Sequence, residues 1–177
     1  MTDAERSFAV RHLEQTRDRV LALAKSLTPE QRIFRRTEND WSAAELIEHL
    51  IVVENFTLGL LDSMIGEDTP DESLRGTKAH KDRIVLENVP VRNTHVQAPD
   101  FMRPAQRWPD FDELIREFEQ TRGRALRFAA TTSADLRAYF RPHPVLKVLD
   151  AYQWLLLIGS HAERHVRQAE EGIAASA

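Results

Sequence analysis

The fold of this 177-residue chain is decided by one stretch, Trp41-Ser42-Ala43-Ala44-Glu45-Leu46-Ile47-Glu48-His49-Leu50. Ser42 and Glu45 stand in the Ser-x-x-Glu relation of a capping box, in which each side chain accepts a hydrogen bond from the other residue's backbone N–H. Trp41 precedes the cap and Leu46 is the fourth helical residue, which is the spacing of a hydrophobic staple. The apolar run that follows predicts a broadly buried helix from the cap to about Met64.

Three more stretches have helical periodicity, from about Asp3 to Ser26, from Asp110 to about Ala130 and from about Lys147 to Glu171. Thr28 followed by Pro29 predicts a short additional turn, because proline is favoured at the first helical position. No stretch gives a convincing strand. Four long amphipathic helices therefore predict an all-α four-helix bundle.

The segment between Gly66 and Pro109 lacks this periodicity and contains four prolines. We expect a long, irregular crossover over about residues 66–109, with a helical turn around Thr77 to Leu86. A crossover of this length lets the third long helix run parallel to the second. A second irregular segment, Phe140 to Pro144, is expected to be extended because of its prolines.

Composition limits the class of protein. The length fits a single domain spanning residues 1–177. The 24 basic and 28 acidic residues give a net charge of −4, which offers no general attraction to nucleic acid, and the arginine-rich runs are interpreted as solvated helix faces. There is no signal-peptide pattern and no apolar run of about 20 residues. We therefore expect a cytoplasmic protein with no membrane partner.

The seven histidines and the absence of cysteine direct attention to a nitrogen-rich metal site. His161 and His165 lie four residues apart on the last helix, so their rings leave the same face one turn apart. Chance alone would produce roughly 0.3 such pairs in this chain, and the pair also fits two surface or interface histidines. His49 is the best third ligand because it lies in an apolar segment of another long helix, although it also fits an ordinary core residue. The remaining histidines, His12, His80, His95 and His143, are in less favourable positions.

At these residues the chain resembles the DinB superfamily, also called DinB/YfiT-like metalloenzymes. The resemblance is carried by Trp41-Ser42-Ala43-Ala44-Glu45-Leu46-Ile47-Glu48-His49-Leu50 and by His161-Ala162-Glu163-Arg164-His165-Val166-Arg167-Gln168, in the family's order and separation. It implies a four-helix bundle with a crossover connection, a homodimer, and one divalent metal held by a histidine triad. Transferred residue by residue, the metal ligands are His49, His161 and His165. Relatives implied by the resemblance include thiol S-transferases and isomerases that use bacillithiol, mycothiol or glutathione.

Three imidazole ligands would favour zinc, nickel or iron over magnesium or calcium, and would leave an open coordination position. Such a site can activate a water molecule or hold a thiolate. Because the chain has no cysteine, any thiol has to come from a low-molecular-weight co-substrate. The sequence thus favours a metal-dependent hydrolase or thiol S-transferase acting on a small-molecule substrate. The alternative is a non-catalytic, dimeric metal-binding or stress-response module.

Three further residues near the expected ligands have two interpretations each. Glu45 and Gln168 are placed to accept an imidazole N–H from a ligand histidine, but they also fit a helix-capping acid and a surface residue, which we favour slightly. Arg164 could bind an anionic substrate, although an ion pair with Glu163 or Glu170 is the simpler expectation.

Overall fold

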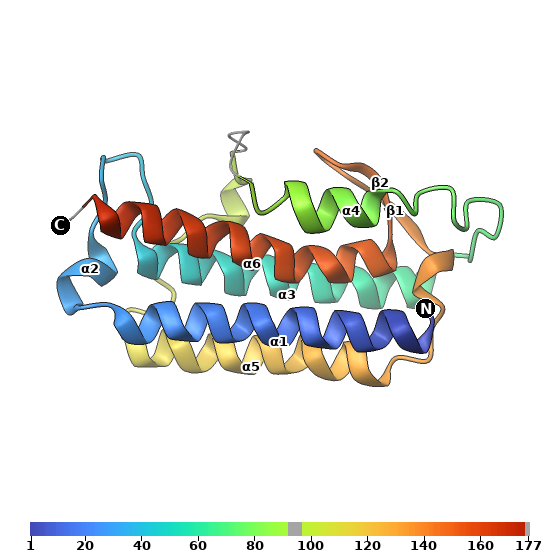
Figure 1. Ribbon diagram of the computed structural model, residues 1–177, viewed down its shortest axis with the longest axis horizontal. Helices are drawn as coiled ribbons and strands as arrows, with labels where there is room; N and C mark the ends of the chain where they lie inside the picture. Colours follow the sequence, from blue (N-terminus) through green and yellow to red (C-terminus); the bar gives the residue numbers. More distant parts are fainter. Residues whose placement is uncertain (92–96, 176–177) are drawn as a thin grey trace.

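The computed structural model describes residues 1–91 and 97–175. Its framework is a bundle of four long helices (Figure 1), namely α1 (Asp3–Ser26), α3 (Ala43–Glu67), α5 (Phe111–Thr131) and α6 (Ala151–Ala174). Each helix packs against two others, in the cyclic order α1, α6, α3, α5. The predicted four-helix bundle is confirmed.

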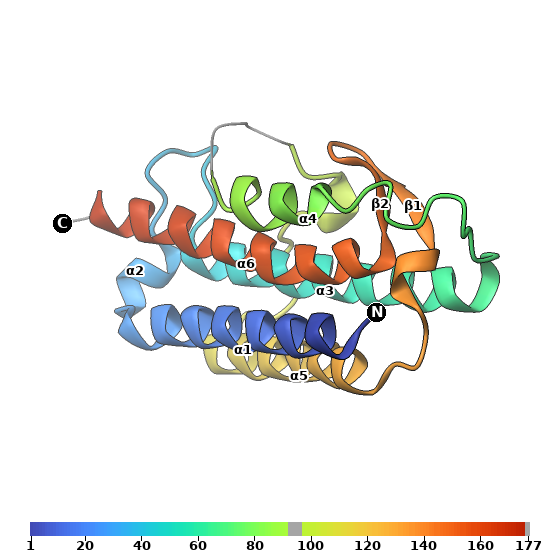
Figure 2. The same ribbon diagram turned by 45° about the vertical axis from the view of Figure 1, so that its right-hand side comes forward.

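The long helices run up, down, down and up. In Figure 1, α1 and α6 run from right to left, whereas α3 and α5 run from left to right. α3 and α5 are therefore parallel neighbours, as the long crossover predicted. The crossover carries α4 (Lys81–Arg83), the π-helical turn η1 (Ile84–Asn88) and the 3-10 turn η2 (Asp100–Met102). Figure 2 shows α4 and η1 lying along α6, which they contact.

Side-chain caps explain where the helices begin. The Ser42 hydroxyl accepts a hydrogen bond from the Glu45 N–H, and the Glu45 carboxylate accepts one from the Ser42 N–H. Thr28 and Gln31 form the same box at the start of the short helix α2 (Pro29–Ile33). A cap of this kind contributes about 1 kcal/mol. The box at Ser42 fixes the first residue of α3, and hence the depth at which His49 enters the bundle.

A buried polar layer divides the apolar core into two halves. One half lies toward the C-terminal end of α1, and its larger buried residues are Val20, Leu23, Leu27, Leu46, Ile47, Leu50, Ile51, Leu114, Phe118 and Val166. The other half contains Leu13, Leu61, Met64, Val85, Leu136, Leu149 and residues 154–158 of α6. Between them lie Thr16, Glu54 and Arg122, each at most 5% exposed, which we call the polar layer. Arg122 donates two hydrogen bonds to the Glu54 carboxylate, at 2.8 and 3.0 Å, and one to Thr16 Oγ1 at 2.9 Å.

Two expectations for the C-terminal region were wrong, namely that the chain has no strand and that the last helix begins at about Lys147. The chain forms an antiparallel hairpin of β1 (Phe140–His143) and β2 (Lys147–Asp150), with Phe140 opposite Asp150. The segment from Lys147 to Asp150 is therefore a strand and not the first turn of the last helix. α6 begins only at Ala151, because the Asp150 side chain accepts a hydrogen bond from the Gln153 N–H and caps the helix there.

The helices keep polar residues among their apolar ones. Within residues 1–91 and 97–175, no helix combines the length and apolarity that crossing a membrane requires.

Candidate metal centre

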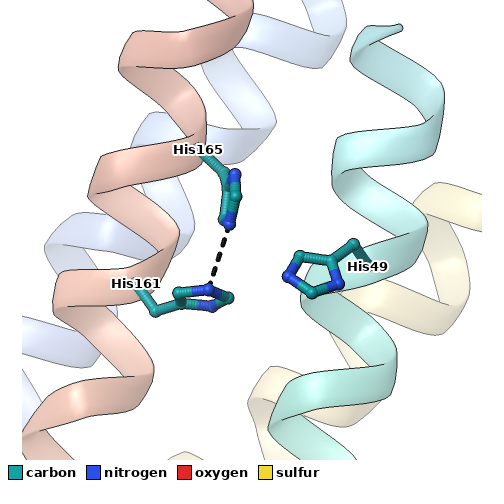
Figure 3. A group of neighbouring side chains, drawn as sticks. All are labelled: His49, His161 and His165. Carbon is teal, nitrogen blue, oxygen red and sulfur yellow. Dashed lines mark hydrogen bonds between the residues drawn. The ribbon is translucent and has the colours of Figure 1, made fainter. Parts of the chain in front are cut away.

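The bundle brings three histidines together between α3 and α6 (Figure 3). His49 comes from α3, and His161 and His165 come from successive turns of α6. Each offers one ring nitrogen, and these three nitrogens all lie within 4.8 Å of one another. Two nitrogens bound to one tetrahedral zinc ion lie about 3.3 Å apart, given bonds of about 2.0 to 2.1 Å. Small movements of the rings would therefore allow the three nitrogens to bind one cation. We call these residues the histidine triad.

Hydrogen bonds at the Nδ1 atoms set the tautomers of two rings. His49 Nδ1 lies 2.8 Å from the carbonyl oxygen of Met102, which can only accept, so a neutral His49 carries its proton on Nδ1. His165 Nδ1 lies 2.9 Å from Oε1 of Gln168, again an acceptor. In both rings Nε2 is therefore the nitrogen that carries a lone pair and no proton. This is the arrangement that a metal-binding histidine needs.

The third ring is joined to the second. His161 Nε2 lies 3.0 Å from His165 Nε2, the contact dashed in Figure 3. Because His165 Nε2 is an acceptor, the proton in this hydrogen bond belongs to His161 Nε2. To bind a cation through Nε2, a neutral His161 has to transfer that proton to its Nδ1 atom. A cation bound by both Nε2 atoms would thus replace the proton that now lies between the two rings.

The surroundings keep His49 and His161 neutral. Burial lowers the pKa of His49, and its hydrogen bond to Met102 opposes this only in part. The pKa of His161 lies well below its usual value, mainly because of burial; protonation is opposed further by His165 and His49 whenever they are charged, and by Arg164. Neutral imidazole is the form that binds metal, so both rings are ready ligands at neutral pH.

Access to the triad is uneven. His49 and His165 are buried, at 4% and 8% exposure, whereas His161 keeps a larger exposed surface. The Trp41 ring contacts His49 with a centroid distance of 4.8 Å and covers that side. His161 is therefore the least buried member of the triad.

The three residues with open roles have definite partners. The Glu45 carboxylate accepts hydrogen bonds from the Arg35 guanidinium and from the backbone N–H of Ser42, the N-cap of α3, as the capping interpretation expected. Gln168 is partly exposed and accepts from His165 Nδ1, which favours the interpretation that it holds an imidazole N–H. Arg164 donates to the backbone carbonyls of Val89 and Val91, at 3.3 and 2.7 Å. Arg164 thereby links α6 to the crossover.

Sequence reasoning missed Glu48 as part of the site. Its carboxylate is buried at 4% exposure and accepts from the backbone N–H groups of Ala105, Gln106 and Arg107. The signal in the sequence was an acidic residue in the middle of an apolar run, next to a candidate ligand. A charge in that position requires buried partners, which here come from the crossover.

The other histidines lie outside the triad. His12 fills the space beside Gly159, where an added Cβ would lie 2.5 Å from His12 Nε2. His143 Nδ1 accepts from two backbone N–H groups in its own hairpin, and its ring packs on Trp154. His80 is exposed at the start of α4. His95 lies outside the described residues.

Comparisons with known proteins agree on one family. A model of the DinB superfamily matches residues 12–169 of the chain. The uncharacterized protein YuaE of Bacillus subtilis (strain 168) is 25% identical over 147 residues, which cover 83% of this chain and 86% of YuaE. The structure of YfiT from Bacillus subtilis, described as a probable metal-dependent hydrolase with an unusual four-helix bundle topology, superposes with a TM-score of 0.65. The match to YfiT covers 99% of this chain and 90% of YfiT at 14% identity, and it shows a shared fold.

Proposed function

This chain belongs to the DinB superfamily, and on that premise we propose that it is a metal-dependent enzyme that acts on a small molecule by hydrolysis or by thiol transfer. The observation that carries the proposal is the histidine triad itself. Its three nitrogen donors converge from two helices, and no Asp, Glu or fourth His of the described residues joins the cluster. Three protein ligands with an open position are typical of catalytic zinc sites, whereas structural sites are closed by four.

The residues present fit a divalent transition metal. The Nδ1 protons of His49 and His165 are held by Met102 and Gln168, which aims both Nε2 lone pairs into the site. His161 would supply the third nitrogen once its proton is on Nδ1. Borderline nitrogen donors suit zinc, nickel or iron. A cation bound there would supply a Lewis acid with an open coordination position.

The charge around the triad supports an anionic reaction partner. Among the groups that lower the pKa of His161, Arg164 is the one that is cationic at neutral pH. The wall formed by Trp41 against His49 keeps water from that side of the ring. An anion such as a thiolate or a substrate carboxylate would therefore be favoured at this site. With no cysteine in the chain, the thiol would be a low-molecular-weight co-substrate.

The alternative is a non-catalytic metal-binding or stress-response module. Homodimer formation is part of both proposals, as is a cytoplasmic location. The enzyme is favoured because only three of the described residues offer ligand atoms in the triad and His161 is partly exposed, whereas structural zinc sites are normally closed by four protein ligands.

The proposal is tested with zinc-, nickel- and iron-loaded protein beside the variant His161→Ala. Two reactions are followed, namely hydrolysis of small esters and amides, and consumption of a low-molecular-weight thiol with an activated electrophile. We expect metal-dependent turnover in one reaction, abolished in His161→Ala while the helical content by circular dichroism is unchanged. Turnover that is equal in the variant would contradict the role of the triad. Stoichiometric metal binding without turnover in either reaction would favour the non-catalytic module.

A further inference from the structure

We propose that Glu48 is a positioning residue for His49, acting through the segment of residues 100–107, which it anchors beside the triad. We call this segment the strap. Glu48 is not among the residues whose ligand atoms gather in the triad. Its carboxylate accepts hydrogen bonds from residues 105–107, so its action on His49 passes through those residues. The hydrogen bonds of the strap provide that connection.

The anchor is a single buried carboxylate with several donors. Oε1 of Glu48 accepts from the N–H groups of Ala105 at 2.8 Å and Arg107 at 3.3 Å, and Oε2 accepts from Gln106 at 3.1 Å. The Arg107 guanidinium adds a bond of 2.8 Å to Oε1. Three consecutive backbone N–H groups can converge on one anion only when the chain curls around it. Gln106 allows this by adopting a φ of 56°, in the left-handed region.

The strap connects this anchor to the ligand. The Arg107 guanidinium also donates to the carbonyl oxygens of Arg103 and Phe101, at 2.9 and 3.4 Å. These two residues flank Met102, whose own carbonyl accepts from His49 Nδ1 at 2.8 Å. Glu48 therefore fixes Arg107, Arg107 holds the carbonyls on both sides of Met102, and Met102 orients His49.

The consequence for His49 is a defined tautomer and ring orientation. With the Met102 carbonyl in place, the proton stays on Nδ1 and Nε2 points toward the other two histidines. Without it, the ring can take either tautomer and rotate about its side-chain bonds. This inference rests on the proposed function for its link to metal, but the tautomer of His49 can be measured in metal-free protein.

The direct test is Glu48→Gln, which preserves the size of the side chain. The carboxamide has one acceptor oxygen, and its NH₂ group would face N–H donors of the strap. A matched control is Glu54→Gln. It alters another buried, arginine-paired glutamate on α3 that has no hydrogen-bond partner in common with the strap among the described residues. The control reports what a loss of stability alone does to the site.

Two quantities are measured in all three proteins. Zinc affinity is obtained by competition with a chromophoric chelator, and the His49 tautomer is read from ¹⁵N chemical shifts of the ring in metal-free protein. In Glu48→Gln we expect zinc affinity to fall about 10- to 100-fold, as for loss of groups that orient metal ligands. We also expect a mixture of the two His49 tautomers. In Glu54→Gln, zinc affinity should stay within about twofold of wild type, because distant sites are nearly independent.

A second variant reaches the strap without changing any charge or any residue of α3. Gln106 is exposed, and Gln106→Val places a β-branched residue where φ is positive, which is unfavourable. It should shift zinc affinity and the His49 tautomer in the same direction as Glu48→Gln. A single Nδ1–H tautomer and unchanged zinc affinity in both strap variants would overturn the inference. If wild type binds no zinc, the proposed function fails, and the tautomer measurement still decides the role of Glu48.

Discussion

The polar layer and the histidine triad are both buried between the helices, but their hydrogen-bonding groups are satisfied in different ways. In the layer, the Arg122 guanidinium and the Glu54 carboxylate neutralise each other. Arg122 also donates hydrogen bonds to Thr16 Oγ1 and to the Leu13 carbonyl oxygen. In the triad, three imidazole rings meet, and no carboxylate of the described residues joins them. The layer is complete without a ligand. The triad brings three ring nitrogens that can serve as metal donors within 4.8 Å of one another, and this is the difference between a structural polar group and a candidate binding site.

The largest expected effect comes from breaking the layer. Arg122→Leu leaves the Glu54 carboxylate buried without its partner, which should lower the free energy of unfolding by about 3–5 kcal/mol. Urea unfolding measures this loss. Zinc affinity of the folded fraction should be unchanged, since the triad shares no hydrogen bond with the layer among the described residues.

The double variant Glu54→Leu/Arg122→Leu sharpens this result. Because replacing both members of a buried ion pair by apolar residues is often close to neutral, most of the lost stability should return. If the double variant were less stable than Arg122→Leu, the layer would do more than satisfy its own charges.

A smaller effect is expected from loss of the hydrogen bond between His165 Nδ1 and Gln168. Gln168→Leu removes the acceptor for His165 Nδ1, so zinc affinity should fall by about tenfold, at the lower end for such contacts. Gln168 is partly exposed, so the free energy of unfolding without metal should change by no more than about 0.5 kcal/mol. Chelator competition and urea unfolding measure the two quantities. A large loss of stability with unchanged zinc affinity would reverse the assignment.

The smallest effect is a change in the pH dependence of stability. His49 and His161 have a pKa below the usual value of 6.5 in the folded chain, so between the folded and unfolded values the unfolded chain binds more protons. Their contribution is fully present above about pH 6.5 and is lost as the pH falls toward the folded pKa values. Metal-free protein should therefore be less stable at about pH 5.5 than at about pH 7.5.

The variant His161→Gln isolates one part of this slope. Removing one titrating ring should flatten the dependence by at most about 1.4 kcal/mol per pH unit. Part of the slope should remain, because burial also lowers the pKa of His12 and His143, outside the triad. An unchanged slope would mean that His161 is not held neutral by its surroundings.

The same contrast explains what the sequence could predict. The start of α3 follows from a capping box whose members are three residues apart, and the spacing of His161 and His165 follows from helical geometry. Both signals are local. The anchoring of the strap is not, because Glu48 and its partners are 57 to 59 residues apart and the partners lie in an irregular segment. No periodicity or motif connects them.

The strand from Lys147 to Asp150 was missed for a related reason. Its apolar residues continue directly into those of α6, so the pattern alone extends the helix backward. Pairing with Phe140 to His143 and the cap at Asp150 decide otherwise. The pairing depends on a tight hairpin in which Lys147 has a φ of 62°. Positive φ is uncommon for lysine, so the sequence does not indicate this turn.

The most direct test of the account is the metal content of the purified, untagged protein beside His49→Ala, by elemental analysis before and after reconstitution. The account predicts about one transition-metal ion per chain in wild type and its loss in the variant, with the helical content of both proteins unchanged. No metal in wild type even after reconstitution, or equal occupancy in His49→Ala, would contradict the claim that the triad is the open, ligand-binding member of the two buried polar groups.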